Sequence, residues 1–170
     1  MSSATRPESE ERLPTLDGRA LCFGFELITA DILDESVVSL APDEARRHLF
    51  ANVDATLGQR LGAGDVIVAE ELSGTASTAG AAMAALAAAG VTALVARRIA
   101  PSVYPAARAH DLVTLLVDTP GFLHTDDRVR LDLDAAKIVN LSSGDRAAIR
   151  NLDDDERARL RLALGRRPVR

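Results

Sequence analysis

A bend of small, hydroxyl-bearing residues, Ser73–Gly80 (SGTASTAG), is the segment of this sequence best suited to chemistry. It follows a short apolar run, Asp65–Ala69, and precedes an alanine-rich segment with high helix propensity, Ala81–Gly90. In parallel α/β units, ligands bind beyond the carboxyl ends of strands, where free N–H groups and the helix dipole favour anions. The bend therefore suits a carboxylate or phosphate. An equally acceptable interpretation is a simple turn, with Ser77 as the N-cap of the helix.

Two common nucleotide motifs do not fit this bend. Its glycines match the dinucleotide pattern G-x-G-x-x-G poorly, and Ala96–Arg98 stands where such a site needs an acidic residue. Because no lysine follows the glycines, a Walker-type phosphate loop is excluded.

Metal-binding residue types are scarce and scattered. Cys22 is the only cysteine, and the histidines His48, His110 and His124 are far apart in the sequence. One cysteine cannot form an internal disulfide or hold an iron–sulfur cluster alone. We therefore expect no metal and no cofactor in this chain.

The elements that position the bend follow from the hydrophobic pattern. Apolar runs alternate with helical segments at lengths that require right-handed crossovers, which predicts an α/β fold with a parallel sheet core and flanking helices. Period-two alternation after residue 121 predicts additional strands, followed by a helix with acidic residues in its first turn. The expected strands are 20–28, 65–69, 91–96, 112–117, 128–133 and 137–141; the expected helices are 41–62, 81–90, 100–110 and 153–164; 29–34 and 70–80 are expected turns.

Bulk composition limits the function classes. The chain has 170 residues, 47% of them hydrophobic and 26% charged, with a net charge of −5 and a pI of about 5.2. We expect one domain over 16–165 between a disordered tail, 1–15, and a frayed tail, 166–170. The acidic balance argues against nucleic-acid binding. No apolar run is long enough to span a membrane, and the polar N-terminus resembles no secretory signal, so we expect a cytoplasmic protein.

Several motifs resemble those of one known family. The run GDVIVAEELSGTASTAG, followed by a helix, a glycine and a strand, is similar to the swivelling β/β/α domain of the aconitase superfamily, most of all to the small subunit of isopropylmalate isomerase. Upstream, FGFELITADIL and RRHLF resemble the family's F-G-x-x-x-x-T-D-x-I motif and the helix after it. Downstream, DDRVRLDLDAAKIV resembles its closing strands. The resemblance covers about residues 16–160.

The resemblance implies roles for residues of the bend. Ser77 aligns with the family's catalytic serine, whose alkoxide acts as a base, and Thr78 aligns with the serine after it. The substrate would lie against Thr29, Asp31, Gly74, Thr75, Ala76 and Ala79.

The sequence also departs from the family pattern. Ala79 replaces an arginine that grips a substrate carboxylate, and Gly80 and Ala81 replace Glu and His. Ala30 stands where the family has an aspartate, with Asp31 one residue later. A bidentate arginine supplies both geometry and binding energy, so its loss weakens the orientation of a carboxylate.

Other polar residues near the strand ends have two interpretations each. Arg97 and Arg98 could form a substitute anion clamp, or could form surface ion pairs. Glu70 and Glu71 could be acid–base groups or exposed loop carboxylates. Tyr104, the only tyrosine, is expected to be partly buried beside the bend, with or without a functional hydroxyl.

Three functions remain open. The resemblance implies the small subunit of a hydro-lyase that acts on a hydroxylated acid, with a separate large subunit carrying a 4Fe–4S cluster. The eroded motif, with Ala30, Ala76 and Ala79 around the bend, also fits a repurposed stand-alone lyase, isomerase or cyclase for a more apolar small molecule. A non-catalytic partner that keeps the fold and an interface but has lost the site is the third, and a homo-oligomer is possible in each.

Overall fold

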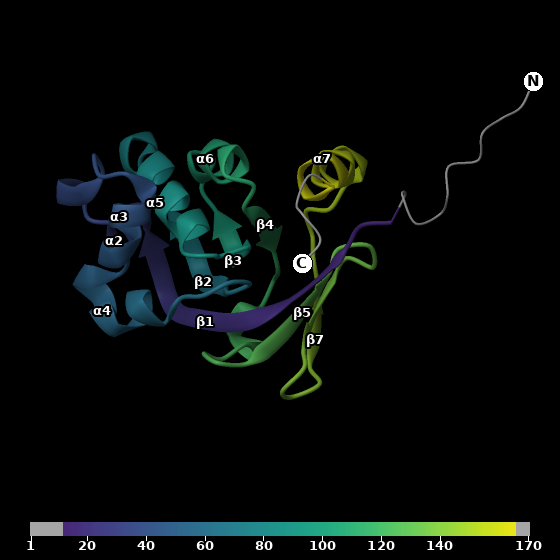
Figure 1. Ribbon diagram of the computed structural model, residues 1–170. Coiled ribbons are helices and arrows are strands. Elements are labelled where there is room, and N and C mark those ends of the chain that lie inside the picture. The colour runs from purple at the N-terminus through teal and green to yellow at the C-terminus, as the bar shows by residue number, and fades with distance from the viewer. Residues whose placement is uncertain (1–11, 166–170) are drawn as a thin grey trace, which may run out of the picture.

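The computed structural model describes residues 12–165, which form one seven-stranded sheet flanked by helices (Figure 1). The strand order is β4-β3-β2-β1-β5-β6-β7. The strands are β1 (Thr15–Ile28), β2 (Val66–Ser73), β3 (Ala93–Ile99), β4 (Val113–Leu116), β5 (Arg128–Asp132), β6 (Lys137–Asn140) and β7 (Arg146–Ala148). The helices are α2 (Thr29–Ile32), α3 (Pro42–Ala45), α4 (Ala51–Arg60), α5 (Ala76–Ala88), α6 (Val103–Ala109) and α7 (Asp154–Leu164), with 3₁₀ turns at Glu35–Val37, Arg46–His48 and Pro120–Phe122.

The sheet has a parallel half and an antiparallel half. β1 to β4 pair in parallel, each with the next, and β5, β6 and β7 continue antiparallel from β1. Because each right-handed crossover moves one strand further in the same direction, α5 and α6 lie on the same face of the parallel strands (Figure 1). The predicted swivelling β/β/α class, a parallel core with flanking helices and additional strands, is confirmed.

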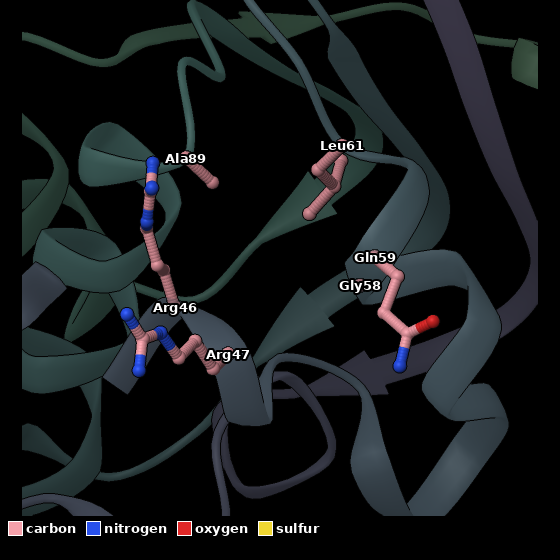
Figure 2. A pocket seen from close by; sticks show the side chains of 6 residues that line it. All are labelled: Arg46, Arg47, Gly58, Gln59, Leu61 and Ala89. Atoms are coloured by element: carbon pink, nitrogen blue, oxygen red, sulfur yellow. The ribbon is translucent and has the colours of Figure 1, made fainter. Parts of the chain in front are cut away.

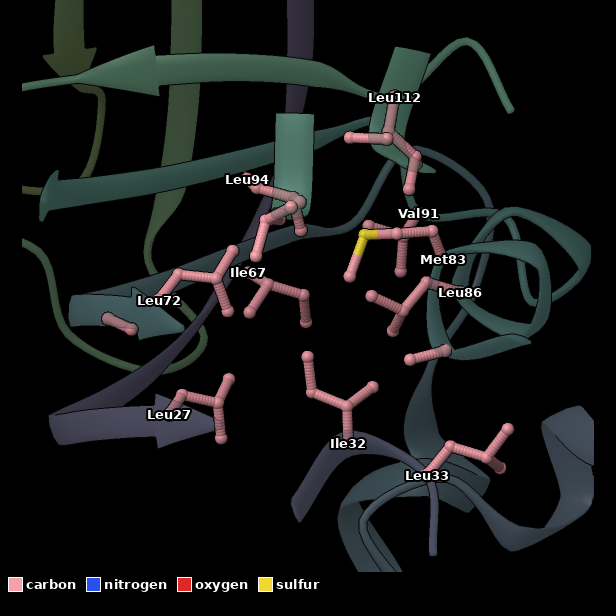
Figure 3. Close-up of a cluster of buried hydrophobic side chains, with 14 of the residues drawn as sticks. Leu27, Ile32, Leu33, Ile67, Leu72, Met83, Leu86, Val91, Leu94 and Leu112 are labelled. Atoms are coloured by element: carbon pink, nitrogen blue, oxygen red, sulfur yellow. The ribbon is translucent and has the colours of Figure 1, made fainter. Parts of the chain in front are cut away.

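Alternate residues of the parallel strands fill two hydrophobic clusters, one on each face. Ile67 and Leu94 face the helices and belong to the same cluster as Met83 of α5 (Figure 3). Their neighbours Val68 and Val95 belong to the second cluster, with residues of β5, β6 and α7. This near-continuous apolar pattern, buried on both faces, is what made the parallel core readable from sequence.

β1 is long because it serves both halves of the sheet. Its first five residues pair with β5, and its second half pairs with β2. Beyond Cys22, whose N–H donates to Thr125 Oγ1 at 3.0 Å, the outer edge of β1 carries no strand in the part of the chain described. Phe25 and Ile28 on this stretch are 48% and 39% exposed.

The expected helix over 41–62 is broken. Between α3 and α4 the chain leaves the helix, and Phe50 adopts a left-handed conformation (φ 58°). That conformation is unfavourable for a non-glycine residue, but it buries the ring completely against Phe23, with ring centroids 4.8 Å apart. Burial of the aromatic ring therefore outweighs local helix propensity.

Other helix and strand boundaries also differ from those expected from the sequence. β1 begins at Thr15, the expected turn after it opens with the single-turn helix α2, and β7 was not foreseen. β2 runs on to Ser73, so Glu70 and Glu71 lie in a strand and not in a loop. The expected tails lie largely outside the described residues, although Leu13 is buried in the second cluster. Over residues 12–165, none of the helices has the length and apolarity needed to cross a membrane.

Candidate functional site

Gly74 allows the bend to pass close to α2. Its φ is +148°, and a Cβ at this position would lie 2.0 Å from Thr29 Oγ1. A glycine is needed here for both conformation and space. The sequence places it between the end of β2 and the start of α5, which brings two distant segments together at the bend.

Four hydroxyl groups form a continuous cluster at this point. Thr29 Oγ1 lies 2.5 Å from Thr78 Oγ1, and both residues are buried. Thr78 Oγ1 lies 3.2 Å from Thr75 Oγ1, which lies 2.8 Å from Ser77 Oγ. The cluster therefore runs from a fully buried threonine to an exposed serine.

The surface of the bend is the first turn of α5. Thr75, Ala76 and Ser77 are exposed, and Thr75 is the N-cap, a position that the simple-turn interpretation gave to Ser77. The helix begins at Ala76, earlier than the expected 81, which places Ser77 beside first-turn N–H groups and the positive end of the dipole. This arrangement can stabilise negative charge on or near the serine oxygen.

One residue that supports the bend was missed by the sequence reasoning. Ser102 Oγ, at the N-cap position of α6, donates a hydrogen bond of 2.7 Å to the Gly74 carbonyl. A serine just before a helical segment is a common capping signal. Its hydrogen-bond partner, at the end of the neighbouring strand β2, could not be predicted from the sequence.

Two other implied substrate residues differ in their exposure. Asp31 is partly buried, and its Oδ2 accepts a hydrogen bond of 3.4 Å from the Ile28 N–H. Ala79 is fully buried, so its methyl group packs in the interior instead of lining an open surface.

The arginines at the end of β3 are engaged by carboxylates on β2. Arg97 Nε lies 2.6 Å from Glu70 Oε1, and Arg98 forms an ion pair with Glu71, its register partner on the adjacent strand. These contacts correspond to the surface ion pairs of the earlier interpretation, and an anion at this end of β3 would have to compete with Glu70 and Glu71 for the guanidinium groups.

Tyr104 lies on α6, where it lines a cavity of about 390 Å³ together with residues of α7. Burial raises the pKa of its phenol, and the Arg108 guanidinium lies 5.7 Å from the centre of its ring. Its surroundings are therefore residues of α6 and α7.

A further cavity, of about 450 Å³, lies beside Ala89, the C-cap of α5 (Figure 2). Ser77 is in the first turn of the same helix. It is lined by Arg46, Arg47, Gly58, Gln59, Leu61 and Ala89. Arg46 Nη1 donates to the Ala88 carbonyl at 3.2 Å, which satisfies a helix C-terminus. Since a 13-residue helix is about 20 Å long, this cavity is separate from the bend.

Cys22 is not suited to bind a metal. Burial, and to a lesser extent the nearby Asp127 charge, raises the pKa of its thiol to about 12. Metal ligation requires the thiolate. Among residues 12–165, no group of three or more His, Cys, Asp or Glu side chains is placed to hold a metal ion.

We expect Cys22 to be nearly inert to alkylation. At pH 8 its thiolate fraction should be about a thousandfold lower than that of a thiol with the usual pKa, because the pKa is raised by about three units. Iodoacetamide labelling followed by mass spectrometry measures the rate, with the same chain in denaturant as the control. Equal rates in the folded and unfolded chain would contradict the burial described here.

Comparison with the sequences of known proteins relates this chain to one kind of enzyme subunit. No protein-family model matches the chain. It is 29% identical to the 3-isopropylmalate dehydratase small subunit of Sulfurimonas denitrificans over 129 residues, 75% of this chain and 77% of that protein. It is also 29% identical to that of Moorella thermoacetica over 134 residues, 76% of this chain and 80% of that protein.

Solved structures agree with the sequence comparison. The 3-isopropylmalate dehydratase structure from Methanocaldococcus jannaschii superposes with a TM-score of 0.75 and 25% identity, over 85% of this chain and 86% of that one. Aconitase X from Thermococcus kodakaraensis shares the fold at a TM-score of 0.53 and 18% identity, over 83% of this chain and 94% of that one. In both sequence and fold, this chain is similar to the small subunits of 3-isopropylmalate dehydratase.

Proposed function

We propose that this chain is the small subunit of a hydro-lyase of the isopropylmalate dehydratase type, acting on a hydroxy acid together with a separate large subunit. The observation that carries the proposal is the exposed Ser77 in the first turn of α5, backed by the threonine cluster. The similarity to small subunits, over three quarters of the chain, supports the same conclusion.

In the proposed reaction Ser77 exchanges a proton with the substrate. Its alkoxide takes a proton from the carbon next to a carboxylate, and the electron pair of that C–H bond forms the double bond. The C–O bond of the neighbouring carbon breaks, and the hydroxyl group departs as water with a proton that an acid of the large subunit would supply. An alkoxide is a costly species at neutral pH unless its charge is stabilised. Here the first-turn N–H groups of α5, the helix dipole and the Thr75 hydroxyl, 2.8 Å away, would stabilise it.

The remaining parts of such a site have to come from the large subunit. Cys22, the only cysteine, is poorly suited to ligation, so a 4Fe–4S cluster does not fit this chain and would reside in the partner. Arg97 and Arg98 are paired with carboxylates, and Ala79 is buried. We therefore infer that a cation for the substrate carboxylate is also supplied by the partner.

The surroundings of the bend support a partner at this end of the sheet. Ile28 is the register partner of Ser73, at the start of the bend, and is 39% exposed; Phe25 on the same strand is 48% exposed. A partner that docks beside the bend would bury these two side chains.

Reconstitution tests the proposal. The chain is mixed with the large subunit of isopropylmalate dehydratase from its own organism, with its cluster intact, and dehydration of isopropylmalate and of other hydroxy acids is followed by the absorbance of the unsaturated product. We expect activity only when both chains are present. Turnover by the chain alone would favour the stand-alone enzyme, and a stable complex without turnover on any hydroxy acid would favour a non-catalytic partner.

A further inference from the structure

The hydroxyl cluster at the bend has a direction, because each hydroxyl group carries one hydrogen but can accept two hydrogen bonds. Among residues 12–165, the hydrogen bond of Thr29 Oγ1 is the one to Thr78 Oγ1. Thr29 is fully buried, so its hydrogen cannot be given to bulk solvent. If Thr78 donated to Thr29, the Thr29 hydrogen would be buried without an acceptor, which is costly. Donation from Thr29 to Thr78 avoids this cost and is the favoured direction.

The second link points the same way. Thr78 Oγ1 has acceptors in its own turn, the Thr75 carbonyl at 3.3 Å and Thr75 Oγ1 at 3.2 Å. Having accepted from Thr29, the Thr78 hydroxyl is polarised and becomes a better donor. Its one hydrogen is shared between the two acceptors of Thr75 or given to one of them, and the bond to Thr75 Oγ1 is the one that continues the chain. The Thr78 hydrogen is thus directed outward, toward the surface of the bend.

The third link reaches the exposed serine. Thr75 Oγ1 lies 2.8 Å from Ser77 Oγ, and both side chains are at the surface. A Thr75 hydroxyl that accepts from Thr78 donates best onward, to Ser77. The Ser77 oxygen then accepts a hydrogen bond from within the protein, and its own hydrogen is free to face a bound molecule.

We infer that Thr29, Thr78 and Thr75 form a one-way hydrogen-bond chain that donates to Ser77 and stabilises the negative charge on its oxygen. The three threonines are positioning residues that act through Ser77, and the catalytic meaning of the chain rests on the function proposed above. A hydrogen bond to the charged form of a group favours that form. The branched threonine side chains also have few rotamers, so the chain is held in place before a substrate arrives.

The direction of the chain is tested on the wild-type protein, without any assay of activity. Buried hydroxyl hydrogens exchange slowly enough to be seen by NMR, and their nuclear Overhauser contacts show where they point. We expect the Thr29 hydroxyl hydrogen to lie toward Thr78, and the Thr78 hydroxyl hydrogen to lie toward Thr75. A Thr78 hydrogen that points to Thr29, or to the Thr75 carbonyl instead of Thr75 Oγ1, would overturn the inference.

Its effect on the reaction is tested with Thr29→Val and Thr29→Ser in the two-subunit complex. Valine keeps the shape but removes the first donor, so we expect kcat to fall about tenfold with KM nearly unchanged. The pKa of the ascending limb of the pH profile, where the base loses its proton, should rise by about one unit. Serine keeps the hydroxyl and should restore kcat to within about twofold. An unchanged pH profile in Thr29→Val would contradict the role of the hydrogen-bond chain in catalysis.

The two proposals fail in different ways. If the wild-type complex dehydrates no hydroxy acid, the proposed function is lost, while the NMR experiment still decides the direction of the chain. If Thr29→Val unfolds, the wild-type spectra remain decisive, because the direction of the chain is read from hydrogens that are present in the wild type.

Discussion

Ser77→Ala in the complex with a large subunit is expected to lower kcat by about a hundredfold or more, with little change in stability. A side chain that transfers a proton in the transition state contributes about 10² to 10⁴ in rate. The Ser77 side chain is exposed, and its hydrogen bond is to the equally exposed Thr75, so its removal leaves no buried group unpaired. Steady-state kinetics and thermal unfolding of the same preparations measure both quantities.

Ser39→Ala provides the matched control. Ser39 is an exposed serine in the segment before α3, and removal of its hydroxyl should leave kcat within about twofold of the wild-type value, as for most surface substitutions. Equal kcat values for Ser77→Ala and Ser39→Ala would show that the exposed serine of the bend takes no part in proton transfer.

Gly74→Ala is expected to destabilise the protein by about 3 kcal/mol and to abolish activity at the bend. The new methyl group would lie 2.0 Å from Thr29 Oγ1 and 2.7 Å from Thr29 Cβ, and the backbone there has a φ of +148°. Thr29 cannot move aside easily because it is fully buried and hydrogen-bonded to Thr78. Chemical denaturation measures the change in the free energy of unfolding.

Gly80→Ala is the natural comparison, six residues further along. Gly80 lies inside α5, and a Cβ there would meet nothing within 4 Å. The substitution should therefore stabilise the helix, by about 0.5–1 kcal/mol, because alanine has the higher helix propensity. A loss of stability of the same size in both variants would mean that Gly74 has no special place in the bend.

The parallel core could be predicted from the sequence, but the details of the site could not. The runs that became β2 and β3 are continuous apolar segments bounded by polar and glycine residues, so their burial was readable locally. The extension of β2 through Glu71 depends on register pairs with Glu26 of β1 and Arg98 of β3. Such pairing is a long-range property that no local window contains.

The same limit applies to the candidate site. The hydroxyl residues of the bend were identified because their types and spacing are local, and Thr29 was added through the resemblance to a family motif. The engagement of Arg97 by Glu70, and the burial of Ala79, depend on which face of a strand or helix turns inward. A shift of one residue in a strand, or of one position on a helix, reverses that orientation.

The shared strand β1 has a consequence for how the molecule unfolds. Its Leu21 contributes to the cluster beneath the helices, and its neighbour Ala20 contributes to the cluster on the opposite face. If β1 separated from the sheet, water would reach the hydrophobic clusters on both faces at the same time. The two halves therefore cannot melt separately, and the described chain should lose its structure in a single cooperative transition.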